Sequence, residues 1–548
     1  MSEFKFACPH CQQHMTVDDS WIGHAIACPG CQNQITVPAP LNAPTPVAAA
    51  PPQPGPESPQ ASGAMRPESP SGGGGKTLVI AAIVGVLAVA GAGVGGFLFM
   101  KSKKGGSGED SPVSAGANGG DSGGMDMGMG TGSGSSSAGQ SADGASPVAV
   151  SGDFPTEHSW PQWRGPNRDG ISTEKGLAKQ WPAGGPPLVW KASGCGGGFS
   201  SVAVAGGRVF TMGDGGQASA VHCFEEATGR KLWSSQPLGR TGGNYEGTKS
   251  TPTVDGDRVY ALGQFGDLVC LNVSDGSDVW RKNLTRDFSG QFSRWNYSES
   301  VLVDEGRLVV SPGGRGGLML ALNKADASPI WRTREWTDEV QYVSPMISNL
   351  GGRKQYIQLT QRVLAGVDAE TGRIVWSAQR PGKTAVIPTP VVYNNIVFVT
   401  SGYGVGCNAF QVGGSGGRMS ARQIYANRDL VNHHGGVVLV DQHVYGHSDG
   451  RGGGQWKCMD VTNGNVLWSA GGVGKGAVVY ADGHLYCRSE GRAGTMALVE
   501  ATSGGYEEKG RFDPPDRSGR EAWAHPVVVN GKLFLRDQDV LLCFDVRG

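Results

Sequence analysis

From residue 200 onward, apolar and polar positions alternate in short paired runs that are separated by Gly, Asn or Asp. Eight such runs occur: SVAVAGGRVFTMG, TPTVDGDRVYALG, SVLVDEGRLVVSPG, SPMISNLGGRKQYIQLT, TPVVYNNIVFVTSG, GVVLVDQHVYGHSD, AVVYADGHLYCRSE and PVVVNGKLFLRDQ. An alternation with period two that is broken by turn residues is typical of β-hairpins. The pattern therefore predicts eight hairpins and no long helix in this part of the chain.

A second motif follows most of these hairpins: a small residue, an apolar residue, Asp, Asn or Glu, three residues, Gly, three residues and Trp. The glycines are Gly229, Gly276, Gly372 and Gly464, and the tryptophans are Trp233, Trp280, Trp376 and Trp468. A fifth copy has Ala327 in the glycine position and ends at Trp331. We expect a turn at the polar residue, a positive φ at the glycine, and the indole on an outer strand covering the seam with a neighbour.

Four short strands per unit, repeated at this spacing, predict a β-propeller over residues 153–548. The last copy stops at LLCFDVRG without a tryptophan strand, whereas PLVW, ending at Trp190, precedes the first hairpin. We therefore expect Trp190 to complete the final blade and close a ring of eight. Two copies are degenerate, with Tyr425 and Phe512 as the expected substitutes for Trp, so seven blades remain an alternative.

Four cysteines fall on the small position of the same motif: Cys223, Cys270, Cys458 and Cys543. Equivalent positions in different blades lie too far apart for disulfides, so we expect buried, inert thiols.

The first residues show a different cysteine pattern. Cys8, Cys11, Cys28 and Cys31 form two Cys-x2-Cys pairs. Two such pairs supply four thiolates to one tetrahedral metal, which predicts a small zinc ribbon over residues 1–37 whose Zn is structural. Disulfides or a redox pair are the alternative. The segment resembles the zinc-ribbon domains at the N-terminus of many bacterial membrane proteins.

Three segments without hairpins connect the ribbon to the repeats. Residues 38–76 are rich in Pro and Gly and 101–152 in Gly and Ser, which predicts a linker and a disordered tether. Residues 77–100 carry no charge and are long enough to cross about 30 Å of hydrocarbon, which predicts one transmembrane helix. Gly91 and Gly95 would permit homodimerisation through that helix. Lysines after the helix slightly favour a cytoplasmic propeller, but a reduced zinc site favours a cytoplasmic N-terminus and an extracytoplasmic, periplasmic propeller, which we prefer.

Composition narrows the function classes. A net charge of −1 gives no general attraction to nucleic acid, so no nucleic-acid partner is expected. The 90 glycines show no triplet period and accompany regular tryptophans, which fits turn-dense β structure.

The Gly-x3-Trp repeats, preceded by WPQWRGPNRDG (residues 160–170), resemble the PQQ-like β-propeller repeat proteins. That family includes quinoprotein dehydrogenases and a non-catalytic propeller lipoprotein that assists outer-membrane barrel assembly. The dehydrogenases share an adjacent Cys-Cys pair against the quinone, and this sequence has no Cys-Cys dipeptide. We therefore expect no PQQ and a non-catalytic, protein-binding scaffold at the cell envelope. A quinone-dependent dehydrogenase or a metal-dependent enzyme on the propeller face is the alternative.

Candidate functional residues lie in the loops before the hairpins. The loops at 242–250, 293–300 and 385–390 precede strands and are expected on one face, with Tyr245, Trp295 and Tyr297 as contacts for a peptide. Four histidines lie close together in the sequence: His433, His434, His443 and His447. They are expected at the same functional rim, and a metal site is an alternative interpretation of them.

Overall fold

The computed structural model describes residues 3–7, 14–18, 24–28, 34–36, 159–243, 245, 247–415, 418–450 and 453–548. The chain divides into two compact units, Met1–Gly132 and Ser133–Gly548. Within these residues no helix is both long and apolar enough to cross a membrane. The transmembrane helix expected at 77–100, with Gly91 and Gly95, lies outside the described residues.

The first unit contains two antiparallel hairpins. One pairs β1 (Glu3–Ala7) with β2 (His14–Asp18), and the other pairs β3 (Ala25–Ala27) with β4 (Gln34–Thr36). Cys28 is buried beside β3, whereas Cys8, Cys11 and Cys31 lie outside the described residues. The zinc site therefore stays a prediction.

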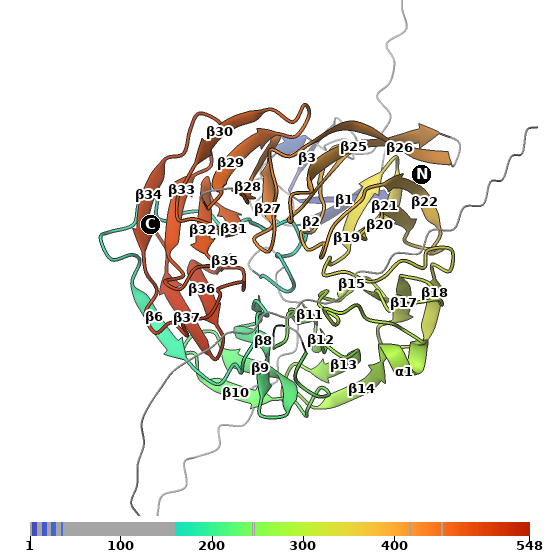
Figure 1. The fold of residues 1–548 in the computed structure, drawn as a ribbon, viewed down its shortest axis with the longest axis horizontal. Helices are drawn as coiled ribbons and strands as arrows, with labels where there is room; N and C mark the ends of the chain where they lie inside the picture. The colour runs from blue at the N-terminus through green and yellow to red at the C-terminus, as the bar shows by residue number, and fades with distance from the viewer. Residues whose placement is uncertain are drawn as a thin grey trace, which may run out of the picture. The chain divides into compact units, whose positions relative to one another are not determined.

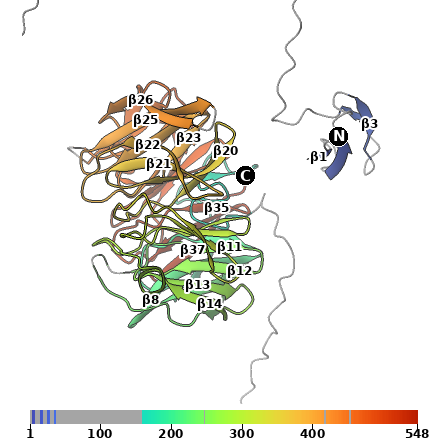
Figure 2. The same ribbon diagram turned by 90° about the vertical axis from the view of Figure 1, so that its right-hand side faces the viewer.

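The second unit is a ring of eight antiparallel sheets, or blades (Figure 1). Blade one contains β7 (Ala203–Ala205), β8 (Arg208–Gly215), β9 (Ala218–Glu225) and β10 (Lys231–Ser234). Blade two contains β11 (Thr253–Asp255), β12 (Arg258–Leu262), β13 (Asp267–Asn272) and β14 (Asp278–Asn283), followed by the short α1 (Leu284–Phe288). Figure 2 shows the strands of this blade side by side.

The next blades repeat this order from the centre of the ring outward. Blade three contains β15 (Leu302–Asp304), β16 (Arg307–Val310), β17 (Leu320–Asn323) and β18 (Pro329–Arg332). Blade four contains β19 (Met346–Leu350), β20 (Arg353–Leu359), β21 (Val363–Asp368) and β22 (Ile374–Gln379). Blade five contains β23 (Val391–Tyr393), β24 (Ile396–Ser401), β25 (Gly406–Ser415) and β26 (Arg418–Asn427). Blade six contains β27 (Val437–Val440), β28 (His443–Ser448), β29 (Gln455–Asp460) and β30 (Val466–Ala470).

The last two blades each take one strand from the segment before blade one. Blade seven contains β31 (Gly476–Ala481), β32 (His484–Ser489), β33 (Met496–Glu500) and β34 (Glu508–Phe512), with β5 (Ile171–Ser172) added in parallel to β31. Blade eight contains β35 (Val527–Val529), β36 (Lys532–Asp537) and β37 (Val540–Asp545), completed by β6 (Leu188–Ala192). Cys543 lies opposite Trp190, so the expected closure of an eight-bladed ring is confirmed.

At three of the seams between blades, a tryptophan of one blade packs on a glycine of the next. The indole of Trp190 lies where a Cβ on Gly229 would be placed, 2.5 Å away, and its Nε1 donates to Glu226 O at 2.9 Å. Trp233 meets Gly276, and Trp331 meets Gly372, in the same way. Each of these glycines has a φ near +70°, as the motif predicts. One blade's ring therefore packs on the next blade's turn.

The two degenerate repeats differ. Tyr425 takes the tryptophan position opposite Ala409 and donates to Val461 O at 3.0 Å, which confirms that substitution. Phe512 does not, because it lies opposite Met496 while Gly510 occupies the position opposite Leu498. The backbone and Cβ of Trp181, from outside the repeat, pack on Gly510 instead. The prediction for Phe512 is therefore wrong.

The motif cysteines are buried, as expected. Cys223, Cys270, Cys458 and Cys543 have at most 1% exposure and form no disulfides within the described part of the chain. Burial raises the pKa of the Cys223 and Cys543 thiols to about 12, so neither is a thiolate at neutral pH.

Candidate functional site

The centre of the ring is crossed by residues 159–172, which we call the plug segment and which appears in teal in Figure 1. Its backbone pairs with innermost strands of different blades: Trp160 exchanges hydrogen bonds of 2.8 Å with Val204, and Gly170 O accepts one from Tyr480 N at 2.9 Å. The buried Arg168 guanidinium donates to Ser300 O at 2.7 Å. WPQWRGPNRDG is thus the segment that closes the central channel.

A pocket open to solvent lies at the centre, and we call it the mouth pocket. Its lining residues are Trp163, Arg164, Phe199, Lys249, Ser298, Ser300, Tyr342, Ser344, Ile387, Pro388, Thr389, His434, Gly436, Trp523 and His525. Apart from Trp163 and Arg164 of the plug segment, all of them lie in loops that lead into innermost strands. The sequence places these loops before strands, so seven of the eight blades contribute to one site.

Aromatic rings from five of these loops form a closed circuit. Centroid distances are 6.1 Å from Tyr245 to Trp295, 6.3 Å on to Tyr342, 6.5 Å on to His434, 4.0 Å on to Trp523 and 5.5 Å back to Tyr245. Tyr245 is 55% exposed, whereas Trp295 is 9% exposed. The circuit therefore presents flat apolar surface that reaches from solvent to the mouth pocket.

The two histidines of the pocket are held as neutral rings. Burial is the main cause that lowers the pKa of His525 to about 3, and it holds the pKa of His434 well below its usual range. His525 Nε2 lies 2.9 Å from His434 O, so that nitrogen carries the hydrogen and Nδ1 is an acceptor. At neutral pH these rings are therefore aromatic planes, and the positive charges of the lining are those of Arg164 and Lys249.

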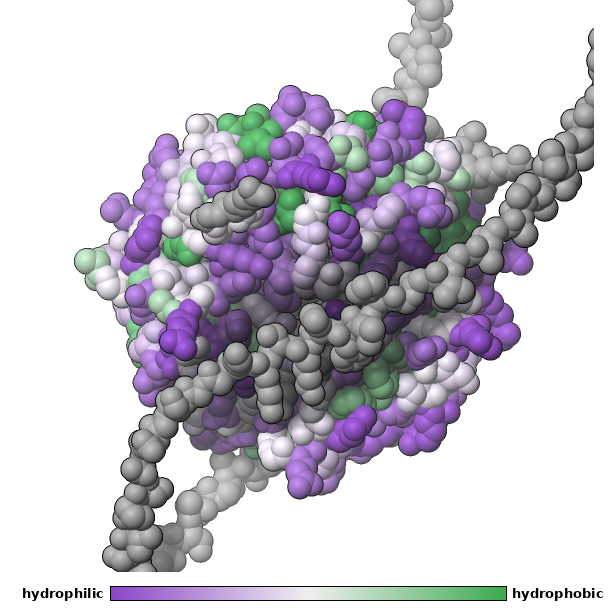
Figure 3. All heavy atoms as spheres, in the orientation of Figure 1, coloured by the Kyte–Doolittle hydropathy of each residue, from purple (hydrophilic) through white to green (hydrophobic). Residues whose placement is uncertain are grey.

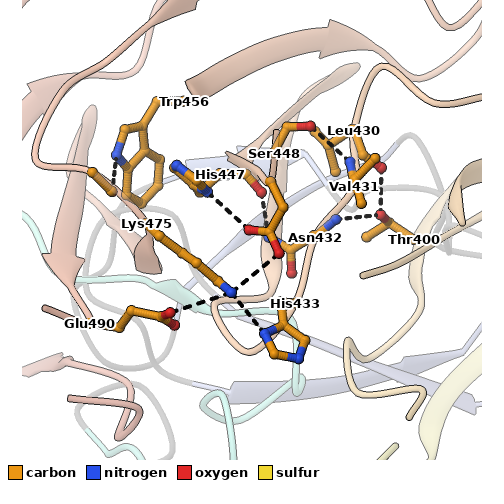
Figure 4. Close-up of polar contacts among 12 residues, drawn as sticks. Thr400, Leu430, Val431, Asn432, His433, His447, Ser448, Trp456, Lys475 and Glu490 are labelled. Carbon is orange, nitrogen blue, oxygen red and sulfur yellow. Dashed lines mark hydrogen bonds and ion pairs between the residues drawn. The ribbon is translucent and has the colours of Figure 1, made fainter. Parts of the chain in front are cut away.

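Beside the mouth pocket, Lys475 lies among His433, Asp449 and Glu490, and we call these four residues the Lys475 cluster (Figure 4). Lys475 Nζ is 3.2 Å from Asp449, 3.3 Å from Glu490 and 2.8 Å from His433 Nδ1. The ammonium donates to Nδ1, so His433 Nε2 carries the hydrogen and donates to the Tyr403 hydroxyl oxygen at 2.8 Å.

This arrangement determines which hydrogen bond the Tyr403 hydroxyl accepts and which it can donate. Burial is the main cause that lowers the pKa of His433 to about 4, and the positive Lys475 adds to it, so the ring stays neutral at pH 7. Tyr403 is 40% exposed and accepts from His433, which leaves its own O–H free to donate outward. The Lys475 cluster therefore orients a hydrogen-bond donor at the rim.

The expected site residues fall into two groups. Tyr245, Trp295, His433 and His434 come together at the rim of the mouth pocket. Tyr297 is buried and donates to Pro312 O at 2.8 Å, so it belongs to the packing of blade three.

The other two histidines do not join this rim. His447 is buried with Nδ1 3.6 Å from Asp449, and His443 lies opposite Asp460 at the far end of β28. Across the described ranges, no three His, Cys, Asp or Glu side chains are grouped as metal ligands.

Sequence reasoning did not identify Phe199, Tyr342, Trp523 or Tyr403, and it included Lys249 only as part of the loop at 242–250. Phe199 and Trp523 lie in the lead-in loops of blades one and eight. Position before a hairpin is the signal that could have found most of them, because every such loop ends at the same face.

Comparisons with known proteins agree with this architecture. The family model of the outer membrane protein assembly factor BamB matches residues 217–470, from the residue before β9 to the end of β30. Among curated proteins, no sequence matches this chain.

Several solved structures are similar. The quinohemoprotein alcohol dehydrogenase from Comamonas testosteroni has a TM-score of 0.51 and 12% identity, covering 71% of this chain and 81% of its own. A quinohemoprotein alcohol dehydrogenase from Pseudomonas putida HK5 has a TM-score of 0.50 and 12% identity, covering 74% and 82%. BamB from Moraxella catarrhalis has a TM-score of 0.44 and 14% identity, covering 61% and 93%. At these identities the likeness to the dehydrogenases shows the fold alone.

Proposed function

We propose that this chain is a membrane-anchored, non-catalytic scaffold of the cell envelope whose propeller binds a protein partner at the mouth pocket. The anchor is the helix at 77–100, and the Zn bound by Cys8, Cys11, Cys28 and Cys31 stabilises a separate N-terminal ribbon. In this proposal the propeller lies outside the cytoplasm, and the tether of residues 101–152 joins it to the helix.

The aromatic circuit is the observation that carries this proposal. Tyrosine and tryptophan are the residues that most often dominate protein interfaces, because they bury a large area at a small entropy cost. Here five rings from five blades surround one pocket, with Tyr245 and Tyr403 exposed above it. The part of the surface turned to the viewer in Figure 3 that grey atoms leave uncovered is mainly hydrophilic, with small, separate hydrophobic groups.

The match of residues 217–470 to the BamB family supports the same function, because that family is described as an outer membrane assembly factor. The alternative is a quinone- or metal-dependent enzyme that uses the same mouth. Among the described residues that line the mouth pocket, Arg164 and Lys249 are cationic and none is a carboxylate. Carboxylates are the charged oxygen ligands that Ca²⁺ sites commonly use. This lining favours the scaffold over a calcium-assisted oxidation.

Site-specific photo-crosslinking in the producing cells tests the proposal. A photoreactive residue is placed at Tyr403 and, as a matched control, at Leu467 on the outer strand of blade six, since the two side chains are 40% and 42% exposed. We expect a discrete adduct with one protein, identified by mass spectrometry, from position 403 and none from position 467. Equal labelling from both positions, or no adduct at 403, would overturn the proposal.

A further inference from the structure

The inner end of the mouth pocket is closed. Trp163 and Arg164 of the plug segment line it, and the plug is fixed to the surrounding blades: Trp163 Nε1 donates to Thr389 Oγ1 at 3.2 Å in blade five. The Trp163 ring also lies 4.6 Å from the His525 ring of blade eight. A polypeptide that enters the pocket therefore has no way through it. This geometry suits the end of a chain better than a loop that must enter and leave.

Arg164 presents an unused donor at that inner end. The side chain is 3% exposed, and its Nη2 donates to Asp169 O at 2.7 Å and to Val437 O. Within the part of the chain that the structure describes, its Nη1 has no hydrogen-bond partner. This atom lies 2.6 Å from the position that a Cβ on Gly436 would take. A buried guanidinium with an open N–H is best matched by a carboxylate, which accepts charge-assisted hydrogen bonds.

The charge of the lining agrees with an anionic ligand. Lys249 is the second cation, and its Nζ donates to Tyr245 O at 3.1 Å, in the loop that carries part of the aromatic circuit. Asp169 acts on Arg164 and Asp214 acts on Lys249, but both carboxylates are outside the lining. Asp169 also accepts from Ile171 N at 3.0 Å. The lining thus combines two positive charges with neutral imidazole and indole planes.

Trp523 adds a second unused donor beside these planes. Its Nε1 is buried and has no hydrogen-bond partner among the described residues. The centroid of its ring lies 4.5 Å from that of Phe199 and 4.0 Å from that of His434. Aromatic side chains prefer such offset or tilted neighbours at about 4.5–7 Å. The part of the pocket beside Trp523 therefore suits a planar apolar side chain that lies close to the carboxylate.

We propose that the mouth pocket binds the C-terminal residue of a partner protein, with an aromatic side chain among Phe199, Trp523 and Tyr342 and the terminal carboxylate at Arg164 and Lys249. This rests on the proposed function, and it specifies the chemistry of the partner. A C-terminal carboxylate adjoins its own side chain, so one residue supplies both groups that the pocket matches. Capture of chain ends by fixed donors is a known mode of peptide recognition.

Fluorescence anisotropy on the full-length protein in detergent micelles tests this. The probe is an N-terminally labelled Gly-Ser-Ala-Phe peptide with a free carboxyl end, compared with its C-terminal amide and with Gly-Ser-Ala-Ala. We expect the amide and the alanine peptide to bind at least about ten-fold more weakly than the free acid, because a charge-assisted contact or an aromatic contact is lost. Equal binding of acid and amide would overturn the proposal.

Two substitutions locate the binding. Lys249→Gln should weaken the free acid about ten-fold and leave the amide unchanged, whereas Lys282→Gln, on the outer strand β14, should change neither. Trp523→Leu should weaken both peptides, which gives a second readout if Lys249→Gln misfolds. Wild-type affinity in both pocket variants would overturn the proposal. If no peptide binds but the Tyr403 adduct forms, only the C-terminal capture is wrong; if neither occurs, the scaffold function fails as well.

Discussion

The imidazole of His434 lies against the indole of Trp523, with ring centroids 4.0 Å apart and planes 32° from parallel. His434 lies in the loop before blade six, and Trp523 lies in the loop before blade eight. Their contact therefore joins two blades that are not neighbours in the ring. The contact holds the two rings in fixed positions relative to each other, so part of the surface proposed for a partner is preorganised by packing within the propeller.

Removing the indole should affect binding more than folding. Trp523→Ala deletes contacts with His434, Phe199 and Tyr245, and we expect the Tyr403 adduct to fall at least about five-fold because an aromatic hot spot is lost. The control is Trp331→Ala at a seam, where a buried ring is lost at a cost of about 3 kcal/mol but the mouth is intact. Crosslink yield and thermal unfolding are measured on both variants. A Trp523→Ala protein with an undiminished adduct would contradict this prediction.

The seam glycines can be tested with a matched pair. Gly372 has a φ of +70°, and a Cβ there would lie 2.4 Å from the Trp331 ring, whereas Gly352 has a φ of +73° and no atom within 4 Å. Gly352→Ala should cost only backbone strain of about 1 kcal/mol. Gly372→Ala should cost about 1–3 kcal/mol more, because the ring must also move. Chemical denaturation measures the difference, and equal destabilisation would argue against indole-on-glycine packing as the seam's fixing contact.

Binding of a carboxylate should weaken in mildly alkaline solution. Burial lowers the pKa of Lys249 to about 8, while the nearby Asp214 acts in the opposite direction. The ammonium is therefore charged at pH 7 and largely neutral at pH 9, whereas the peptide carboxylate stays ionised. We expect the affinity for the Phe-terminated free acid to fall between pH 7 and 9 and that of its amide to stay constant. A flat profile for the free acid would contradict the role of Lys249.

Acid should destabilise the propeller through its buried histidines. Folding lowers the pKa of His525 from 6.5 to about 3, so between those values the unfolded chain binds a proton that the folded chain does not. Stability contributed by His525 is therefore present above pH 6.5 and is lost as the pH falls, by at most about 1.4 kcal/mol per pH unit. His525→Gln should have a shallower decline in unfolding free energy between pH 6.5 and 4 than the wild type. Parallel curves for the two proteins would contradict the shift.

Repetition explains why so much of the fold could be predicted. The hairpins and the Gly-x3-Trp motif recur in register, so even the unusual closure through Trp190 could be inferred from a missing strand at one end and a spare strand at the other. Tyr425 fits the same position because an aromatic ring with a polar tip keeps the hydrogen bond across the seam. Phe512 could not be assigned correctly, because its blade fills the position with Gly510 and uses Trp181 from outside the repeat.

The residues of the mouth pocket were only partly predictable, because they do not belong to a repeated motif. Its residues come from lead-in loops of different sequence, and no periodic signal relates Phe199, Tyr342 and Trp523. Tyr245 and Trp295 could be proposed from local aromatic content, but the same reasoning included Tyr297, which turns into the core of blade three. Arg164 and its open donor depend on a plug that crosses the ring, and only the assembled fold shows this.

The central claim is that the mouth holds a partner and carries out no oxidation. The most direct measurement titrates full-length wild type and Trp523→Ala with pyrroloquinoline quinone and calcium, followed by dye-coupled oxidation of alcohols and sugars. The scaffold account predicts no turnover in either protein, together with a Tyr403 adduct that depends on Trp523. Saturable quinone-dependent turnover in the wild type that is lost in Trp523→Ala would contradict it and would identify the mouth as an oxidation site.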